Sequence, residues 1–353
     1  MHEPCSTVRG ERARSQTRPQ KRRSIRKNRR HTGGMLSQAK RAAFGCLRAV
    51  MPNRVRDAVF VLRRYKRKFG TFPNVVRPTT FNEKVIWRML FDRRPIWTRL
   101  QDKYALRGYV KERLGEDILP KLYWVTQDPS DIPLADLPRQ FVVKPTHGSG
   151  WVRLVPDKVC LDDQELIATC RSWLAQNYYH VEREWAYKHI EPRIVVEEFV
   201  SDGTGKYPID YKIYVFGGRA RLIQIDTARF EDHRRDIYDV SWTKTGATSE
   251  YQNADRTLER PAHLQEMVAC AEAIGDGLDF IRVDFYDTKD RLYLGELTTT
   301  PGGGMNTWGP VEFTRYMGGL WKLPYGVIMS GNARMGRAAL PQADATPRRG
   351  APG

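Results

Sequence analysis

Two segments near the C-terminal end of the chain constrain its fold most strongly. In residues 281–286 apolar and polar side chains alternate, which is typical of a strand with one buried face, and residues 293–298 have a similar composition. A polar stretch around Asp290 separates them, so they predict an antiparallel hairpin over residues 280–300. A chain with this hairpin must build at least one antiparallel or mixed sheet.

The polar face of this hairpin carries a candidate metal site. Asp284 shares a strand face with Arg282, and Glu296 shares one with Thr298. A turn centred on Asp290 sets the two carboxylates opposite each other, about 5 Å apart at Cβ, where they can ligate one or two Mg²⁺ ions that bridge nucleotide phosphates. The alternative is a solvated charged face. The apolar neighbours in both strands and the glycine-rich residues 298–304, which suit the edge of a site, favour the metal site.

Residues 141–150 contain a candidate phosphate-binding loop. Residues 141–143 predict a short buried strand, and Lys144 follows at its end. The glycines after it let backbone N–H groups approach phosphate oxygens closely, whereas the alternative for such a loop alone is an ordinary turn. The loop residues are His147, Gly148, Ser149 and Gly150.

Two further strands carry polar residues that a nucleotide site can use. Lys212 shares a strand face with Asp210, so it is either a second cation for phosphates or one partner of a surface ion pair. The strand predicted over residues 194–200 is either an edge strand or a segment that offers backbone groups and a carboxylate to an adenine amino group. Its last residues are Glu197, Glu198, Phe199 and Val200.

The order of the predicted elements indicates an α+β fold. A capping box formed by Thr80 and Glu83 opens one helix, another spans residues 102–114, and a third follows Asp162. A hairpin about residues 217–218 and a helix between Pro261 and Gly275 come later. Helices followed by mixed hairpins and helices predict antiparallel or mixed sheets. Neither G-x-G-x-x-G nor G-x-x-x-x-G-K-[ST] occurs, so a doubly wound fold is not expected.

The positive charge of the chain is concentrated near its start. The 353 residues have a formal net charge of +18, and residues 1–70 hold 21 of the 59 basic residues but only 3 of the 41 acidic ones. The rest of the chain is neutral overall, so we expect no specific nucleic-acid partner. Five cysteines without a C-x-x-C pair, no apolar run of about 20 residues and no signal-peptide pattern favour a cytoplasmic protein.

These patterns divide the chain into four parts. Residues 1–34 are expected to be a disordered basic tail, or an artefact if translation starts at Met35. Residues 35–79 are a basic helical segment in which residues 36–69 either lie on an anionic membrane surface or pack on the body; Val55, Val59 and Leu62 are the expected apolar stripe. The catalytic body spans residues 80–330, and residues 331–353 are a disordered C-terminal tail.

Six motifs, taken in order, resemble the TupA-like ATP-grasp family, which is associated with teichuronopeptide and other bacterial cell-surface polysaccharides. The resemblance covers about two thirds of the chain, and its specificity comes from the order of the motifs. It implies an ATP-grasp fold, in which two α+β lobes clasp a nucleotide, with a helical segment before it. The motifs are Thr80-Phe81-Asn82-Glu83-Lys84, Asp102-Lys103-Tyr104-Ala105-Leu106-Arg107, Phe141-Val142-Val143-Lys144 with His147-Gly148-Ser149-Gly150, Asp210-Tyr211-Lys212, Arg282-Val283-Asp284 and Gly295-Glu296-Leu297-Thr298.

The resemblance implies which residues bind ATP and Mg²⁺. Lys103 and Lys144 would bind phosphates, the loop of residues 147–150 would close over them, and residues 197–200 would contact adenine. Lys212 would meet the γ-phosphate.

At the other end of the implied site, Arg282 would steady the phosphoryl group or the acceptor carboxylate, while Asp284 and Glu296 would hold Mg²⁺. Thr298 stands where the wider superfamily commonly has a metal-binding Asn. Since a hydroxyl is a weaker oxygen ligand, a second metal ion is in doubt.

The resemblance also implies the reaction. The γ-phosphoryl group of ATP would pass to a carboxylate, and an amine would attack the resulting acylphosphate, so the site must position and neutralise anions. The expected substrates are an amine and a carboxylate such as a uronic acid on a cell-envelope polysaccharide or its lipid-linked precursor. One alternative is a glycosyltransferase or phosphotransferase of the same pathway. Another is a basic anchor or RNA-binding protein with a degenerate nucleotide fold, which the neutral body disfavours.

Overall fold

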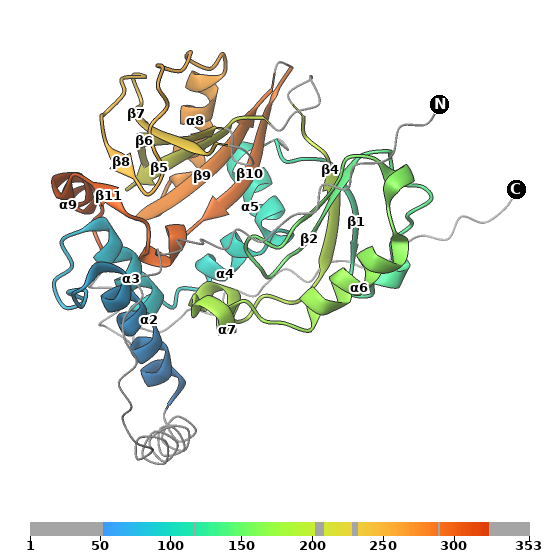
Figure 1. Ribbon diagram of the computed structural model, residues 1–353, viewed down its shortest axis with the longest axis horizontal. Helices are drawn as coiled ribbons and strands as arrows, with labels where there is room; N and C mark the ends of the chain where they lie inside the picture. Colours follow the sequence, from blue (N-terminus) through green and yellow to red (C-terminus); the bar gives the residue numbers. More distant parts are fainter. Residues whose placement is uncertain (1–51, 116–117, 202–207, 228–231, 289, 325–353) are drawn as a thin grey trace, which may run out of the picture. The chain divides into compact units, whose positions relative to one another are not determined.

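Two antiparallel sheets form the framework of the protein (Figure 1). The computed structural model describes residues 52–115, 118–201, 208–227, 232–288 and 290–324. The predicted tails, residues 1–34 and 331–353, and the first part of the basic segment lie outside these residues. One sheet has four strands in the order β1-β4-β2-β3, and the other has five in the order β10-β9-β5-β6-β7.

The four-stranded sheet holds the predicted phosphate-binding loop at the end of a central strand. Its strands are β1 (Leu122–Thr126), β2 (Phe141–Pro145), β3 (Arg153–Val155) and β4 (Ile194–Glu198). Helix α6 (Asp163–Leu174) packs on it through Leu166 and Cys170, and the Asp162 side chain caps this helix as predicted. Strand β4 ends at Glu198, so Phe199 and Val200 follow the strand and are not part of it.

The five-stranded sheet contains both predicted hairpins. Its strands are β5 (Asp210–Phe216), β6 (Arg219–Thr227), β7 (Arg234–Asp239), β9 (Phe280–Asp287) and β10 (Leu292–Thr298). Gly217 and Gly218 join β5 to β6 with φ values of 55° and 76°, a left-handed conformation that glycine adopts at little cost.

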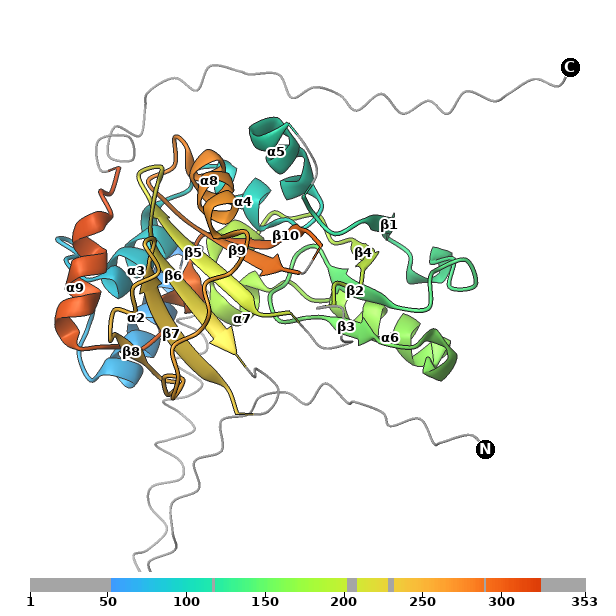
Figure 2. The same ribbon diagram turned by 90° about the horizontal axis from the view of Figure 1, so that it is seen from above.

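One face of this sheet is mostly apolar and is covered by helices (Figure 2). Ile213, Val283 and Phe285 on this face pack with α4 (Ile96–Gln101), α5 (Ala105–Leu114) and α8 (Leu264–Gly275). The predicted boundaries of two of these helices were wrong by a few residues: α5 begins at Ala105, and α8 begins at Leu264 and includes Gly275.

The opposite face of the sheet is divided into an aromatic and a polar half. Tyr214, Phe216 and Phe280 pack against α2 (Asn53–Phe69), α3 (Phe81–Phe91) and α9 (Val311–Leu320). Asp210 and Lys212, at the other end of β5, lie on this same face because they are four and two residues from Tyr214, respectively. A short pair, β8 (Thr248–Ser249) with β11 (Trp308–Gly309), completes the strands of the described residues.

Helix α3 begins at the predicted capping box. The Thr80 side chain accepts a hydrogen bond from the Glu83 amide, and the Glu83 carboxylate accepts one from the Thr80 amide. The predicted apolar residues of this helix, among them Val85 and Ile86, are buried.

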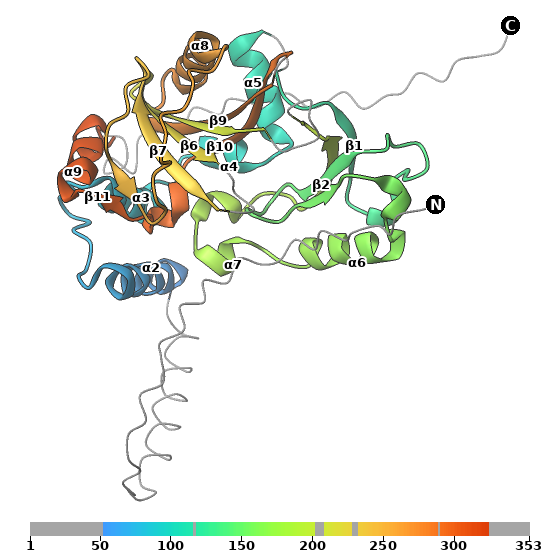
Figure 3. The ribbon, with the colours of Figure 1, turned by 45° about the horizontal axis from the view of Figure 1, so that its top comes forward.

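Helix α2 packs on the body of the protein. Its buried residues are Asp57, Val61 and Tyr65, one turn apart, and the last two belong to the same apolar cluster as α3. The predicted stripe was therefore wrong in its position, since Val55 is 43% exposed. Figure 3 shows α2 on the same side of the molecule as α7 (Tyr179–Glu182), where the Tyr179 hydroxyl donates to Asp57 at 2.8 Å.

The hairpin of β9 and β10 contains a bulge at Gly295. Phe285 pairs with Leu294, but the next pair is Asp284 with Glu296. A turn centred on Asp290 predicts the pair of Asp284 with Glu296 but not that of Phe285 with Leu294. The strands first pair at Asp287 and Leu292, and the bulge then shifts the register by one residue, which brings Glu296 opposite Asp284. A Cβ atom at Gly295 would lie 2.6 Å from the ring of Tyr286, so a glycine leaves room for that ring.

Among the described residues, no helix combines the length and the apolar character that crossing a bilayer requires.

Candidate active site

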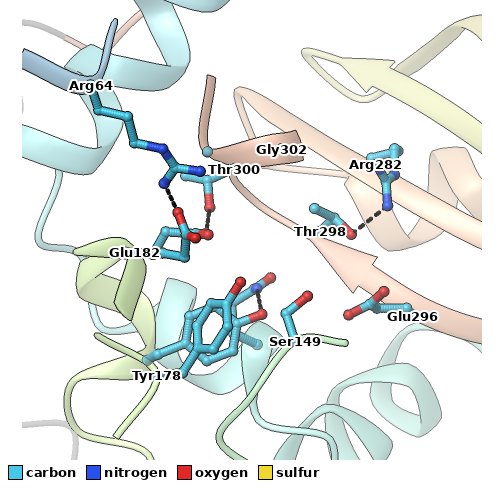
Figure 4. Close-up of a pocket in the computed structure, with 13 residues that line it drawn as sticks. Arg64, Ser149, Tyr178, Glu182, Arg282, Glu296, Thr298, Thr300 and Gly302 are labelled. Atoms are coloured by element: carbon cyan, nitrogen blue, oxygen red, sulfur yellow. Dashed lines mark hydrogen bonds and ion pairs between the residues drawn. The ribbon is translucent and has the colours of Figure 1, made fainter. Parts of the chain in front are cut away.

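A cavity of about 210 Å³ is lined by residues from the five-stranded sheet, the loop after β2 and helix α2, among others (Figure 4). Of the predicted site residues, Ser149, Arg282 and Glu296 line it, and so do Thr298 and Thr300 of the segment predicted to be a site edge. The other lining residues are Arg64, Gln101, Tyr178, Glu182, Glu184, Tyr187, Gly302 and Gly303.

One member of the predicted carboxylate pair, Glu296, lines this cavity, and the other, Asp284, lies beside it on the neighbouring strand. Asp284 and Glu296 are cross-strand partners, which confirms their predicted opposition. The Arg282 guanidinium donates from Nε and Nη2 to the two oxygens of Asp284 at 2.7 and 2.6 Å, and Nη2 also donates to the Thr298 hydroxyl at 3.0 Å. Burial, with the neighbouring Asp210 carboxylate acting in the same direction, raises the pKa of Asp284 to about 6.

Lys212 belongs to a buried network of charges beside this pair. Its Nζ contacts the carboxylate of Asp210 and lies 3.3 Å from Asp226 and 3.9 Å from Asp284. Arg235 donates to Asp226 at 2.6 Å. Burial opposes ionisation of Asp226, but Lys212 and Arg235 hold the pKa of its carboxyl well below the usual range. The ion-pair alternative for Lys212 is therefore present, although the pair is buried in the sheet and not on the surface.

The predicted phosphate lysines come together at the edge of the four-stranded sheet. Lys103 donates from Nζ to the carbonyl of Gly148, and Lys144 Nζ lies 2.7 Å from Oε2 of Glu197. Burial lowers the pKa of Lys103, while the nearby carboxylate of Glu296 acts against this. Lys103 thus interacts with the loop of residues 147–150, through the carbonyl of Gly148, and with Glu296 of the carboxylate pair.

Within that loop, the His147 side chain has a structural role. Its Nε2 lies 3.0 Å from the carbonyl oxygen of Trp173 and 3.1 Å from that of Gln176, at the end of α6. Burial lowers the pKa of this imidazole. The ring of Trp151 occupies the space that a Cβ at Gly148 would need, at 2.3 Å. The loop is thus held to the end of α6 by His147, and Ser149 is its member at the cavity.

The predicted adenine segment is present, but both of its carboxylates already have partners. Glu197 is buried between Lys144 and Arg107, whose Nη1 lies 3.3 Å from it. Glu198 accepts a hydrogen bond from the Tyr293 hydroxyl at 3.0 Å and another from a backbone amide.

The residues at the far end of the cavity were not among the site residues predicted from the sequence. Arg64 of α2 forms an ion pair with Glu182, and the Thr300 hydroxyl donates to Glu184. Burial raises the pKa of Glu184 to about 7. Apolar residues do not recur at a regular spacing in residues 178–187, because α7 is a single short turn. The signal that the sequence offered here was the pair of glutamates at positions 182 and 184.

The sequence of the chain matches a known protein family. A sequence model of the family described as TupA-like ATP-grasp matches residues 83–322, which is more than half of the chain. The chain belongs to the TupA-like ATP-grasp family. The matched residues of this ATP-grasp protein include both sheets and exclude α2. Among curated proteins, none matches the sequence.

Solved ATP-grasp ligases are similar in structure to this family member. They include a D-alanine–D-alanine ligase from Bacillus anthracis in complex with ATP (18% identity, TM-score 0.34, 58% of this chain and 55% of that one). The D-alanine–D-alanine ligase from Helicobacter pylori has 17% identity and a TM-score of 0.37, with 64% and 59% coverage. The ligase PsnB with Mg and ADP has 14% identity and a TM-score of 0.34, with 58% and 52% coverage. The chain thus spans little more than half the length of these proteins.

The residues of the carboxylate pair fit a magnesium ion. Magnesium prefers oxygen ligands and is commonly held by one or two carboxylates together with substrate phosphates. Asp284 and Glu296 supply such carboxylates from adjacent strands. Arg282 covers both oxygens of Asp284, so its side chain must turn aside before that carboxylate ligates a cation.

Proposed function

We propose that this ATP-grasp protein is an ATP-dependent, ADP-forming ligase that joins a carboxylate to an amine through an acylphosphate. The observation that carries the proposal is the cross-strand carboxylate pair Asp284 and Glu296, of which Glu296 lines a cavity together with Arg282. Two acidic ligands and a guanidinium on one sheet face can hold a nucleotide's terminal phosphates beside an acceptor carboxylate.

In this proposal each group of residues has one task. Lys103 and Lys144 bind phosphates, the loop of residues 147–150 covers them, and residues 197–200 contact adenine. Asp284 and Glu296 hold Mg²⁺, which supplies neutralisation of the phosphate charge. The reaction needs positioning and charge neutralisation, so it needs no nucleophilic side chain.

Lys212 and Arg282 act on the transferred group. Arg282 neutralises the acceptor carboxylate or the phosphoryl group after it leaves Asp284. Lys212, fixed among three carboxylates, reaches the γ-phosphate or keeps Asp284 in place.

We further propose that the reaction belongs to cell-envelope polysaccharide biosynthesis, with a uronic acid of the polysaccharide or its lipid-linked precursor as the carboxylate. The protein would then work in the cytoplasm, at the inner face of the cytoplasmic membrane. The exposed basic residues Lys66, Arg67 and Lys68 in the last turn of α2 support this placement because clustered cations are attracted to an anionic membrane surface.

The test is ADP release by the purified full chain with ATP, Mg²⁺ and a panel of uronic acids, each with and without amino acids. Hydroxylamine, which is uncharged at neutral pH, is added as a nucleophile that traps acylphosphates. Hydroxamate formation that depends on the carboxylate supports ligation. Consumption of a nucleotide sugar in place of ATP supports glycosyl transfer, and a stable phosphorylated product supports phosphotransfer.

A further inference from the structure

The function proposed above does not use the far end of the cavity. This end is formed by Arg64, Tyr178, Glu182, Glu184 and Tyr187. These residues come from helix α2, outside the part of the chain that matches the family, and from residues 178–187. They line the same cavity as Arg282 and Glu296, so a molecule bound here lies next to the proposed site of phosphoryl transfer.

The charges that line the cavity are not balanced. Two cations, Arg64 and Arg282, and three carboxylates, Glu182, Glu184 and Glu296, line it among the described residues. Arg282 is engaged by Asp284, while Arg64 pairs with Glu182 and also interacts with Glu184. In the proposed function Glu296 belongs to the metal pair, so Glu182 and Glu184 share one guanidinium.

Glu184 is buried, with 7% of its surface exposed. Within the part of the chain that the structure describes, its hydrogen bond comes from a neutral donor, the hydroxyl of Thr300. A buried carboxylate is costly unless a charged or strongly polar group compensates it, and the raised pKa of Glu184 is consistent with incomplete compensation. A cation in the cavity would supply what is missing.

The neighbouring side chains also suit an organic cation. Tyr178 and Tyr187 line the cavity, and their rings pack edge to face with centroids 4.7 Å apart. Aromatic rings beside carboxylates bind ammonium groups through the charge distribution of the ring as well as through the carboxylate. Glu184 contacts Thr300, and Arg282 contacts Thr298 two residues earlier, so both ends of the cavity meet on one segment.

We propose that Glu184, with Tyr178 and Tyr187, forms a site for the ammonium group of the amine substrate, and that Arg64 positions Glu182 at its rim. This inference rests on the proposed ligase function, because it places the amine beside the carboxylate that Arg282 neutralises. It identifies the second substrate as one that carries a positively charged amino group.

The experiment measures binding of ethylamine, which is charged at neutral pH, by saturation-transfer NMR on the full chain. Ethanol and propionate serve as neutral and anionic probes of similar size. We expect ethylamine to bind the wild type, and Glu184→Gln to weaken this binding at least tenfold. Glu191→Gln, at an exposed glutamate whose partner is Arg193, is the matched control and should bind like the wild type.

A second variant gives a change of the opposite sign. Arg64→Gln removes the competing cation, so ethylamine should bind several-fold more tightly. The thermal midpoint of each variant shows that the fold is intact. Wild-type binding of propionate that is lost in Arg64→Gln, or equal binding of ethylamine by the wild type and Glu184→Gln, would overturn the inference.

The two proposals fail separately. If no carboxylate supports hydroxamate formation by the wild type, the ligase function is wrong whatever the NMR shows. If hydroxamate forms but Glu184→Gln binds ethylamine normally, ligation stands and the ammonium site is wrong.

Discussion

Replacing Lys212 with Met tests whether the buried charge network holds this end of the sheet together. The substitution keeps the length of the side chain and removes the cation that lies within 4 Å of Asp210, Asp226 and Asp284. Removing one partner from a buried ion pair costs about 3–5 kcal/mol. Asp226 retains Arg235 and Asp284 retains Arg282, so we expect the lower end of this range.

The assay is urea unfolding of the full chain. With an m value of about 2–3 kcal/mol per M, a loss of about 3 kcal/mol lowers the midpoint by about 1–1.5 M. Lys111→Met, on the exposed side of α5, is the control and should stay within about 0.5 kcal/mol of the wild type.

The effect should also depend on pH. Burial already raises the pKa of Asp284, and losing the opposing Lys212 raises it further, so the folded variant takes up a proton more readily than the unfolded one as the pH falls. Its deficit relative to the wild type should therefore shrink between pH 8 and pH 5. A midpoint within 0.3 M of the wild type at pH 8, or a deficit that grows toward pH 5, would refute the reasoning.

Three further predictions concern activity, stability and location. Asp284→Asn and Glu296→Gln should each lower ADP release at least about a hundredfold without unfolding the protein, and near-normal turnover in both with the same Mg²⁺ dependence would contradict the metal assignment. Thr80→Ala should cost about 1 kcal/mol in urea unfolding, because the capping box of α3 is lost; an unchanged midpoint would argue against its contribution. Changing Lys66, Arg67 and Lys68 together to Glu should abolish sedimentation with anionic vesicles at moderate salt, since each basic residue near such a surface contributes about 1 kcal/mol; equal sedimentation of variant and wild type would contradict membrane docking.

Local patterns in the sequence were sufficient to predict several parts of the fold. The capping box at Thr80, the N-cap at Asp162 and both hairpins depend on contacts between residues close in the chain, and all are present. Asp284 and Glu296 also face each other, as the alternation and the turn predicted. Such features have their physical causes within one or two adjacent elements.

The far end of the cavity could not be predicted in this way. Arg64 and Glu182 are more than a hundred residues apart in sequence. They meet only because Val61 and Tyr65 fix α2 on the body of the protein. The sequence also left two roles open for Lys212, a cation for phosphates or one partner of an ion pair. Alternation indicates which residues share a face of one strand, but not which residues of neighbouring strands lie beside them. Strands β6 and β9 flank β5 and bring Asp226 and Asp284 beside that lysine.

The bulge at Gly295 determines where the hairpin can gain or lose a residue. Deleting Gly295 would leave a regular ladder in which Leu294 still pairs with Phe285 and Glu296 with Asp284, so the two carboxylates would stay opposite each other. Deleting Leu297 would instead turn the hydroxyl of Thr298 toward the apolar core. Related chains that lack one residue in this strand can therefore keep the same site, provided that the missing residue corresponds to position 295. A sequence alignment that places the gap one or two positions later would match residues from opposite faces of the sheet.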